Sequence, residues 1–335
     1  MNLESETASL APFRLEPQYV ERIWGTPDLR PWYNFVSDPS PGHNPIGEVW
    51  LTGDDCRVKT GVLAGKSLSE VFSNHAVAML GHAAAERMQG QSPLLLKVIF
   101  AKEKLSVQVH PDDRLAQKYG DPRGKTECWY TLAAESGAAV AAGLKSGVTL
   151  EQVEREVADG TLEESLEVVP VTAGDMIYVD AGTVHAIWPG SVLLETQQNC
   201  DLTYRMYDYG RGRELHIQKS LEATRLATRA GKIPPRVLAD RILLIDREYF
   251  RVERIAVAGS RTSASLADEG EPAPGLQYLF VAGGAARIAG PSFEAVELPM
   301  GGMVAVPAAS PEFVVEDLGS LDLMRITPRW PGEDL

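Results

Sequence analysis

Short apolar segments, bounded by glycine, proline and aspartate, recur along most of the chain. Some alternate apolar and polar residues, as in LSVQVH, and others are almost continuously apolar, as in LLLKVIFA. Both patterns are typical of short β-strands. The segments expected to form strands are 46–53, 94–101, 105–110, 128–133, 175–180, 192–198 and 202–208, followed by 241–259, 276–290, 293–309 and 312–327. So many short strands predict a mainly β chain arranged as an antiparallel sandwich or barrel.

Helices are few. In KSLSEVFSNHAVAMLG, Ser67 is followed three positions later by Glu70, which is the capping-box pattern at the start of a helix. Thr149 and Gln152 repeat this spacing in GVTLEQVEREVADG. The helices that these patterns predict span 66–81 and 147–160, with a further short helix at 161–169 and a helical connector at 220–230. Residues before about Leu15 are expected to form a loose tail.

The paired prolines of GKIPPRVLADR, residues 231–241, predict a linker between two domains. All six histidines precede residue 217 and all three cysteines precede residue 201. We therefore expect a metal-binding domain over 1–230, with small helical insertions, and a smaller β domain without metal ligands over 231–335.

Composition and charge narrow the classes of protein. The chain has 335 residues, 44% of them hydrophobic, and a net charge of −14. This charge argues against nucleic acid and anionic membranes as partners, and no apolar run is long enough to span a bilayer. Three cysteines without framework spacing, and no visible signal sequence, indicate a reducing, cytoplasmic setting. Cys128 is expected to be a buried core residue rather than a ligand, since strand neighbours point to opposite faces.

Residue types that bind divalent metals lie in three separate segments: Gln108, His110, Glu127 and His185. Gln108 and His110 are two apart on an expected strand, so their side chains leave the same face, and Ser106 shares that parity. Lys125 and Glu127 are also two apart. Two imidazoles, a carboxylate and an amide oxygen suit one divalent ion with a position left open for water or substrate. From spacing alone, ordinary hydrogen-bonded strand residues are an equal alternative.

The segment around His185 resembles the second sequence pattern of cupin barrels. The matching residues are Gly174, Asp175, Gly182 and His185. Asp180 stands where that pattern has proline. The first cupin pattern is matched poorly, because QxH replaces HxH and the glutamate lies farther downstream. The resemblance implies a β-barrel with a metal rather than a particular activity.

Two basic residues also stand out. Lys97 interrupts the apolar run LLLKVIFA, and a lysine in a buried strand is costly unless it is paired or points into a wet cavity. The alternative for Lys97 is an edge residue whose amine reaches solvent. Arg205, in TYRMYD, could be a catalytic residue that contacts an anion or the transition state in a cleft, or it could stack on an aromatic ring or pair with Asp208.

Several longer segments, taken together, resemble the type I mannose-6-phosphate isomerases of the short bacterial kind. They are IGEVW (46–50), PLLLKVIFAKEKLSVQVHPDD (93–113), GKTECWY (124–130), GDMIYVDAGTVHAI (174–187), LLETQQNCDLTYRMYDYGR (193–211) and ELHI (214–217). The resemblance implies two cupin-like jelly-roll β-barrel domains. It also implies one Zn²⁺ bound by Gln108, His110, Glu127 and His185. Lys97, Lys125 and Arg205 would then face the site, and Ser106 would lie near the substrate phosphate.

The reaction implied is the interconversion of mannose 6-phosphate and fructose 6-phosphate through a cis-enediol. Lys125 is a candidate proton carrier or a plain contact to substrate, while Glu195 and Asp201 are weaker candidates for which hydrogen-bonding roles are favoured. Two other classes stay open: an iron oxygenase with two histidines and one carboxylate, and a non-catalytic sugar-binding cupin. The expected partner is a small sugar phosphate, and the expected assembly is a monomer or homodimer.

Overall fold

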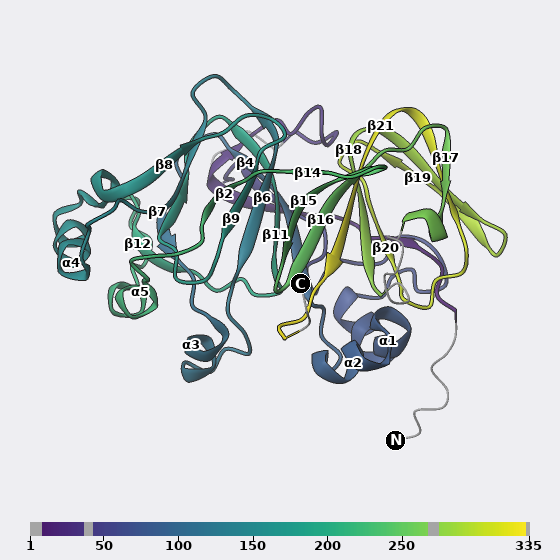
Figure 1. Ribbon diagram of the computed structural model, residues 1–335, viewed down its shortest axis with the longest axis horizontal. Helices are drawn as coiled ribbons and strands as arrows, with labels where there is room; N and C mark the ends of the chain where they lie inside the picture. The colour runs from purple at the N-terminus through teal and green to yellow at the C-terminus, as the bar shows by residue number, and fades with distance from the viewer. Residues whose placement is uncertain (1–8, 37–42, 267–274, 333–335) are drawn as a thin grey trace.

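The computed structural model describes residues 9–36, 43–266 and 275–332, and there the chain is mainly β with few helices, as predicted (Figure 1). Its strands form sheets of nine, seven and five members, each an open path between edge strands. The finer prediction of two jelly-roll barrels stays a prediction. Within the described residues, no helix is both long enough and apolar enough to cross a membrane.

The seven-stranded sheet is covered on both faces. Along one of its strands, Leu193 packs into the core shared with the five-stranded sheet, and Leu194 packs into the core shared with the nine-stranded sheet. A strand buried on both sides has no solvent face, which explains the almost continuous apolar runs. In order, the strands are β13 (Gly231–Ile233), β9 (Met176–Val179), β6 (Glu127–Ala134), β11 (Ser191–Gln198), β4 (Leu94–Ala101), β3 (Ile46–Trp50) and β2 (Gln18–Thr26).

The five-stranded sheet packs against the seven-stranded one through a core that includes Trp129, Ile177, Val140 and Ile187. In order, its strands are β12 (Tyr204–Tyr207), β5 (Val107–Val109), β10 (His185–Ile187), β7 (Ala139–Leu144) and β8 (Leu166–Pro170). Its other face packs against α4 (Leu150–Asp159) and α5 (Ile217–Ala223). On β5, Val107 and Val109 belong to that helix-side core, so Gln108 between them points toward the seven-stranded sheet.

The nine-stranded sheet has a core of its own and packs its other face on the seven-stranded sheet. Its strands are β1 (Phe13–Arg14), β20 (Met303–Val306), β18 (Gln277–Gly290), β21 (Val314–Pro328), β16 (Phe250–Ile255), β15 (Arg241–Arg247) and β14 (Arg236–Val237), with β17 (Ser260–Thr262) beside β21 and β19 (Phe293–Pro299) beside β18. The prediction of a loose tail before Leu15 is wrong for residues 9–14, because Phe13 pairs with Ala305 and is buried. Residues 1–8 lie outside the described part.

Two predicted helices are confirmed. In α1 (Leu68–Leu80), the Ser67 side chain accepts from Glu70 N, and Glu70 accepts from Ser67 N, so the capping box is complete. In α4, Thr149 accepts from Gln152 N. The helix predicted at 161–169 is mostly wrong, because only a 3-10 turn, η2 (Leu162–Ser165), precedes β8. The connector predicted at 220–230 is helical only to Ala223 in α5. The remaining helical elements are α2 (His82–Met88), α3 (Asp113–Lys118) and η3 (Ser263–Leu266).

The predicted linker at 231–241 runs from one half of the molecule to the other. Its first part is β13, which pairs with β9 at the edge of the seven-stranded sheet. Its second part is β14, which pairs with β15 at the edge of the nine-stranded sheet. Pro234 and Pro235 separate the two strands and have no backbone N–H to continue either ladder. The domain boundary after residue 230 stays a prediction.

Candidate metal centre and its cavity

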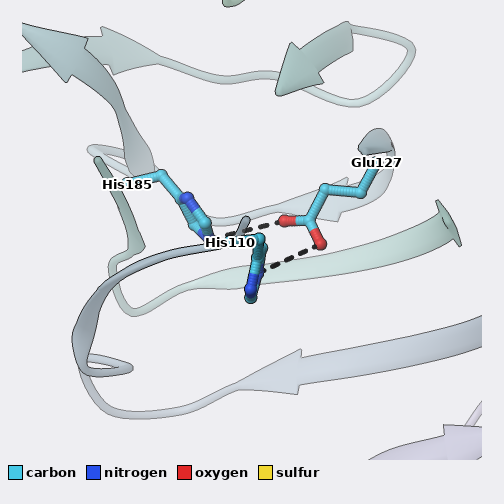
Figure 2. Close-up of side chains that lie close together, drawn as sticks. All are labelled: His110, Glu127 and His185. Atoms are coloured by element: carbon cyan, nitrogen blue, oxygen red, sulfur yellow. Dashed lines mark ion pairs between the residues drawn. The ribbon is translucent and has the colours of Figure 1, made fainter. Parts of the chain in front are cut away.

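Three side chains of metal-binding type meet between the seven- and five-stranded sheets: His110, Glu127 and His185 (Figure 2). His110 follows directly after β5, Glu127 begins β6 and His185 begins β10. The antiparallel pairing of β10 with β5 sets His185 opposite Gln108, although the two are 77 positions apart in sequence. One potential ligand atom from each of the three lies within 4.8 Å of the others.

Glu127 is the carboxylate of this cluster and is fully buried. Its Oε1 lies 3.5 Å from His185 Nε2, and its Oε2 lies 3.5 Å from His110 Nε2. Lys125 Nζ forms an ion pair with Oε2 at 2.7 Å, whereas Oε1 accepts no hydrogen bond. A buried carboxylate oxygen without a partner is costly. The arrangement therefore fits a cation held between this carboxylate and the two imidazoles.

The imidazoles are in the protonation state that metal binding requires. His185 Nδ1 lies 2.9 Å from the carbonyl oxygen of Thr183, a hydrogen bond that places the proton on Nδ1 and leaves the Nε2 lone pair directed at Glu127. Burial lowers the pKa of His185 to about 4. Burial, with Lys125 adding to it, lowers the pKa of His110 well below its ordinary value. Both rings are thus neutral at neutral pH, as a metal ligand must be.

Gln108 lies against the same two rings. Its Nε2 is 3.2 Å from His185 Nε2 and 3.5 Å from His110 Nε2, while its Oε1 accepts a hydrogen bond of 3.1 Å from Ser106 Oγ. Rotating the terminal amide by half a turn exchanges its oxygen and nitrogen. In that orientation Gln108 would offer oxygen to a cation and nitrogen to Ser106, so the hydrogen bond to Ser106 would be kept.

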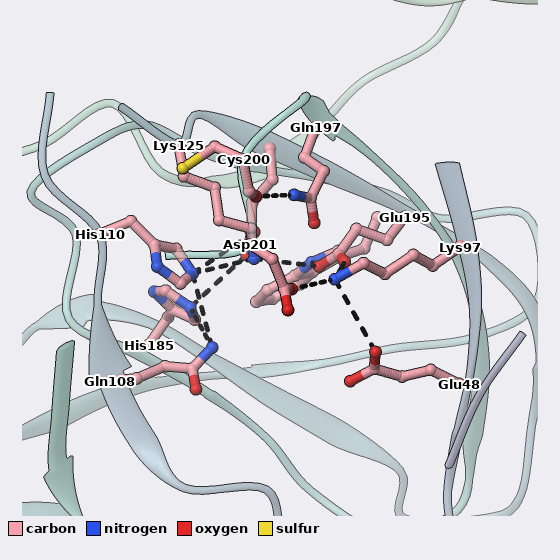
Figure 3. Close-up of polar contacts among 12 residues, drawn as sticks. Glu48, Lys97, Gln108, His110, Lys125, His185, Glu195, Gln197, Cys200 and Asp201 are labelled. Atoms are coloured by element: carbon pink, nitrogen blue, oxygen red, sulfur yellow. Dashed lines mark hydrogen bonds and ion pairs between the residues drawn. The ribbon is translucent and has the colours of Figure 1, made fainter. Parts of the chain in front are cut away.

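Lys125 is buried beside the centre (Figure 3). Its Nζ lies 2.7 Å from Glu127 Oε2, 3.2 Å from His110 Nε2 and 3.9 Å from Glu195 Oε1. Burial by itself would lower the pKa of this amine, but the attraction of Glu127 and Glu195 outweighs burial and raises it. Lys125 and Glu127 thus lie on the same face, as their spacing of two positions predicted.

Lys97 is also buried and belongs to an ion-pair network rather than to a solvent-exposed edge. Its Nζ donates to Asp201 Oδ1 at 2.8 Å and lies 3.7 Å from Glu195 Oε2 and 3.8 Å from Glu48 Oε2 (Figure 3). The amine also lies 4.6 Å from the ring centroid of Trp50. Burial opposes the charge, but Glu48, Asp201 and Glu195 together raise the pKa of Lys97.

Glu195 is the residue that the sequence reasoning undervalued. It is 4% exposed and lies between the two lysines, and its Oε1 accepts a hydrogen bond of 3.1 Å from Trp129 Nε1. Burial raises its pKa to about 7, while Lys125 and Lys97 oppose the shift. Glu195 stands directly opposite Lys97 in the β11–β4 pairing. A charged residue inside an apolar strand is the sequence pattern that singled out Lys97, and the same pattern applies to Glu195. Glu48, in IGEVW, fits this pattern as well.

A cavity of about 500 Å³ lies over the centre, and its lining includes Lys97, Ser106, Gln108, Lys125 and Arg205. Arg205 lies opposite Gln108 in the β12–β5 pairing, and its Nη1 donates to the carbonyl of Glu214 at 2.8 Å. Its buried Nε has no hydrogen-bond partner. Burial and the nearby positive charges of Arg213 and Arg22 lower the pKa of Arg205. Among the described residues, the lining also includes five carboxylates, which balance its five basic residues, so an anionic ligand would draw chiefly on Arg205, whose Nε has no partner.

The structure brings together the residues that the sequence analysis named as ligands or site contacts: Lys97, Ser106, Gln108, His110, Lys125, Glu127, His185 and Arg205, with the weaker candidates Glu195 and Asp201. Cys128 is not among them, because it packs into the core on the other face of β6, as predicted. The roles of these site residues as ligands or catalysts stay predictions.

Comparisons with known proteins identify the family of the chain. Residues 12–159 match the model of the phosphomannose isomerase type I catalytic domain. Mannose-6-phosphate isomerase from Streptococcus mutans is 34% identical over an alignment of 262 residues that covers 74% of this chain and 80% of that protein. The crystal structure of mannose 6-phosphate isomerase from Bacillus subtilis superposes with a TM-score of 0.80 at 27% identity, covering 95% of this chain and all of that one.

A more distant structure, of a mannose 6-phosphate isomerase described as holo and zinc bound, gives a TM-score of 0.74 at 17% identity. It covers 96% of this chain and 100% of that one. At this identity the likeness shows the fold alone.

Proposed function

The chain belongs to the family of type I mannose-6-phosphate isomerases, and we propose that it interconverts mannose 6-phosphate and fructose 6-phosphate. One observation carries the proposal. A buried His-Glu-His cluster, in which Glu127 Oε1 has no partner, lies at a cavity whose lining also includes two lysines and Arg205. A metal site beside several cations suits a substrate that is an anionic sugar.

We propose that one Zn²⁺ is held by His110, Glu127, His185 and the amide oxygen of Gln108. The donor set supports this, because neutral imidazole and carboxylate are typical zinc ligands and an open position is left toward the cavity. The more distant relative described as zinc bound has the same fold. When bound, the ion would supply positive charge that stabilises an oxyanion developing on the sugar.

The residues of the chain would move the proton between C1 and C2. Lys125 is one candidate carrier, because once a cation takes up the charge of Glu127 its strongest attraction is weakened and burial again lowers its pKa. Glu195 is the second candidate, because its carboxyl lies 3.9 Å from Lys125 Nζ in the same buried network. Either group would act at the face of the cavity next to the metal centre.

Recognition of the phosphate is assigned to Arg205 and Ser106, which lie on the β5–β12 side of the cavity next to Gln108. Arg205 has a buried Nε without a partner, and Ser106 Oγ lies on the same strand face as Gln108. A guanidinium binds phosphate strongly because its N–H groups match the geometry of the anion. Lys97 is expected to hold the sugar hydroxyls through its network with Asp201 and Glu195.

The test is a coupled assay of mannose 6-phosphate isomerisation on purified protein, together with elemental analysis before and after chelation. We expect about one metal ion per chain, activity that is lost on chelation, and recovery when Zn²⁺ is restored. Metal-loaded protein without isomerase activity would refute the proposal. Oxygen uptake with added Fe(II) would point to the oxygenase class instead, and sugar binding without turnover would point to a binding protein.

We further propose that each half of the chain is a cupin-like jelly roll, with 1–230 catalytic and 231–335 structural. Two facing sheets enclose the core of the first half, and the nine-stranded sheet encloses a core of its own in the second, which supports this assignment. A cytoplasmic location is proposed on the strength of three free cysteines. A monomer or homodimer is the proposed assembly.

A further inference from the structure

The turn between β15 and β16, in the C-terminal half, reaches the loop that follows His110. Tyr249, in that turn, donates its hydroxyl hydrogen to Asp113 Oδ2 at 3.0 Å. Asp113 begins α3, three residues after His110, in the HPDD segment. We propose that Tyr249 is a positioning residue for the catalytic site, so that the C-terminal half completes a site that it does not line.

Asp113 holds the segment that carries Lys125. Its other oxygen, Oδ1, accepts from the backbone N–H of Gly124 at 2.8 Å and from Gln198 Nε2 at 2.9 Å. Gln198 Oε1 in turn accepts from the backbone N–H of Thr126 at 2.9 Å. One carboxylate therefore anchors the strand entrance that carries Lys125, directly through Gly124 and indirectly through Thr126.

Residues 124–126 pack closely against the HPDD segment and Gln198. The backbone N–H of Lys125 donates to the carbonyl of Pro111 at 3.0 Å, so three successive residues each hydrogen-bond to the HPDD segment or to Gln198. A Cβ on Gly124 would lie 2.4 Å from the oxygen of Pro111. The two segments touch backbone to backbone, and the positions of Lys125 and His110 are therefore coupled.

The hydroxyl of Tyr249 holds the second oxygen of Asp113. It occupies the Asp113 oxygen that neither Gly124 nor Gln198 uses, and it fixes the rotation of that carboxylate about its side chain. Without it, Asp113 is free to turn toward solvent or toward only one of its other donors. The expected consequence is a looser Gly124–Glu127 segment and a displaced Lys125 amine, which costs rate because reacting groups must be held closely.

The test compares Tyr249→Phe with Tyr33→Phe, each of which removes only a hydroxyl. Tyr33 is the matched control. Its hydroxyl also donates a hydrogen bond to the C-terminal half, to the carbonyl oxygen of Gly301 at 3.1 Å, but neither residue lines the cavity. In Tyr249→Phe we expect kcat to fall about fivefold with KM unchanged, since phosphate contacts come from other strands. Tyr33→Phe should leave both constants unchanged. Equal kinetics for the two variants would overturn the proposal.

A second readout does not need turnover. Backbone amides of residues 124–126 should exchange with deuterium faster in Tyr249→Phe than in the unmodified protein, and Tyr33→Phe should not change them. In an Asp113→Ala background, Tyr249→Phe should add nothing further, because its partner is already lost. Unchanged exchange, or fully additive effects, would refute the positioning role. The kinetic arm rests on the proposed isomerase function, whereas the exchange arm decides the inference even if the protein proved not to be an isomerase.

Discussion

Replacing Lys97 with methionine removes one buried positive charge while keeping a side chain of similar length. Lys97 is 3% exposed, and three carboxylates lie within 4 Å of its amine: those of Asp201, Glu195 and Glu48. In the variant, these carboxylates lose the cation that they share. Because the amine is buried, solvent screening does not reduce the effect.

We expect the variant to lose about 3–5 kcal/mol of the free energy of unfolding, the usual effect of removing one partner of a buried ion pair. That is a large share of the roughly 5–15 kcal/mol that stabilises a typical domain. Lys102→Met is the matched control, because Lys102 Nζ lies 3.8 Å from Glu135 but both side chains are more than half exposed. The control should lose less than about 1 kcal/mol.

The loss should depend on pH in a defined direction. Burial would raise the pKa of Glu48, but Lys97, Arg22 and Trp50 more than offset it and lower the pKa to about 2. A lowered folded-state pKa stabilises above the ordinary value near 4.5 and stops stabilising as the pH falls through about 2. Without Lys97, the pKa values of Glu48 and Glu195 rise, so both carboxyls take up protons on mild acidification. The destabilisation should therefore be larger at pH 8 than at pH 5.

The assay is urea unfolding of both variants and the unmodified protein at pH 8 and pH 5, followed by intrinsic fluorescence and far-UV circular dichroism. A loss below about 1 kcal/mol at pH 8 would show that the network around Lys97 is not energetically coupled to it. A loss that grows on acidification would contradict the assigned charge states.

Three further substitutions test the carboxylate ligand of the metal, the close approach at Gly124 and the N-cap of α1. Glu127→Gln should reduce bound metal from about one ion per chain to near zero while the circular dichroism spectrum is kept, because a neutral amide replaces the only anionic ligand; retained stoichiometry would exclude this residue as a ligand. Gly124→Ala should lower the free energy of unfolding by about 1–3 kcal/mol, because the added Cβ would lie 2.4 Å from Pro111 O. In thermal unfolding, an unchanged melting temperature would argue against this close approach. Ser67→Ala should lower the free energy of unfolding by about 1 kcal/mol through loss of the N-cap of α1, measured by chemical denaturation. Ser73→Ala, at an exposed position inside α1, is the control, and equal losses would remove the special role of the cap.

Patterns that depend on neighbours two to four positions apart were predictable from the sequence. The strand segments follow from apolar periodicity, and the start of α1 follows from Ser67 and Glu70. Side-chain parity placed Gln108 with His110, and Lys125 with Glu127, on common faces. It also placed Cys128 in the core on the opposite face. These inferences hold because backbone geometry alone sets which way adjacent side chains point.

Local patterns misled where long-range packing competes with them. The segment 161–169 has helix-forming residues, yet β8 pairs with β7 at the sheet edge and leaves only one 3-10 turn. The residues before Leu15 were expected to be loose, but Leu10 and Phe13 are buried and β1 adds to a sheet whose other strands come from residues 236–328. Neither outcome can be read from residues nearby in sequence.

By itself, the sequence determined the strands, their buried faces and the residue types able to bind a metal and an anion. Only the tertiary structure decided how they meet. The β10–β5 register sets His185 opposite Gln108, and the β11–β4 register sets Glu195 opposite Lys97. Register depends on how whole sheets pack, and a shift of one residue would turn each of these side chains to the other face. For the same reason the contact between Tyr249, in the β15–β16 turn, and Asp113, at the start of α3, becomes visible only in the folded protein, because the two are 136 positions apart.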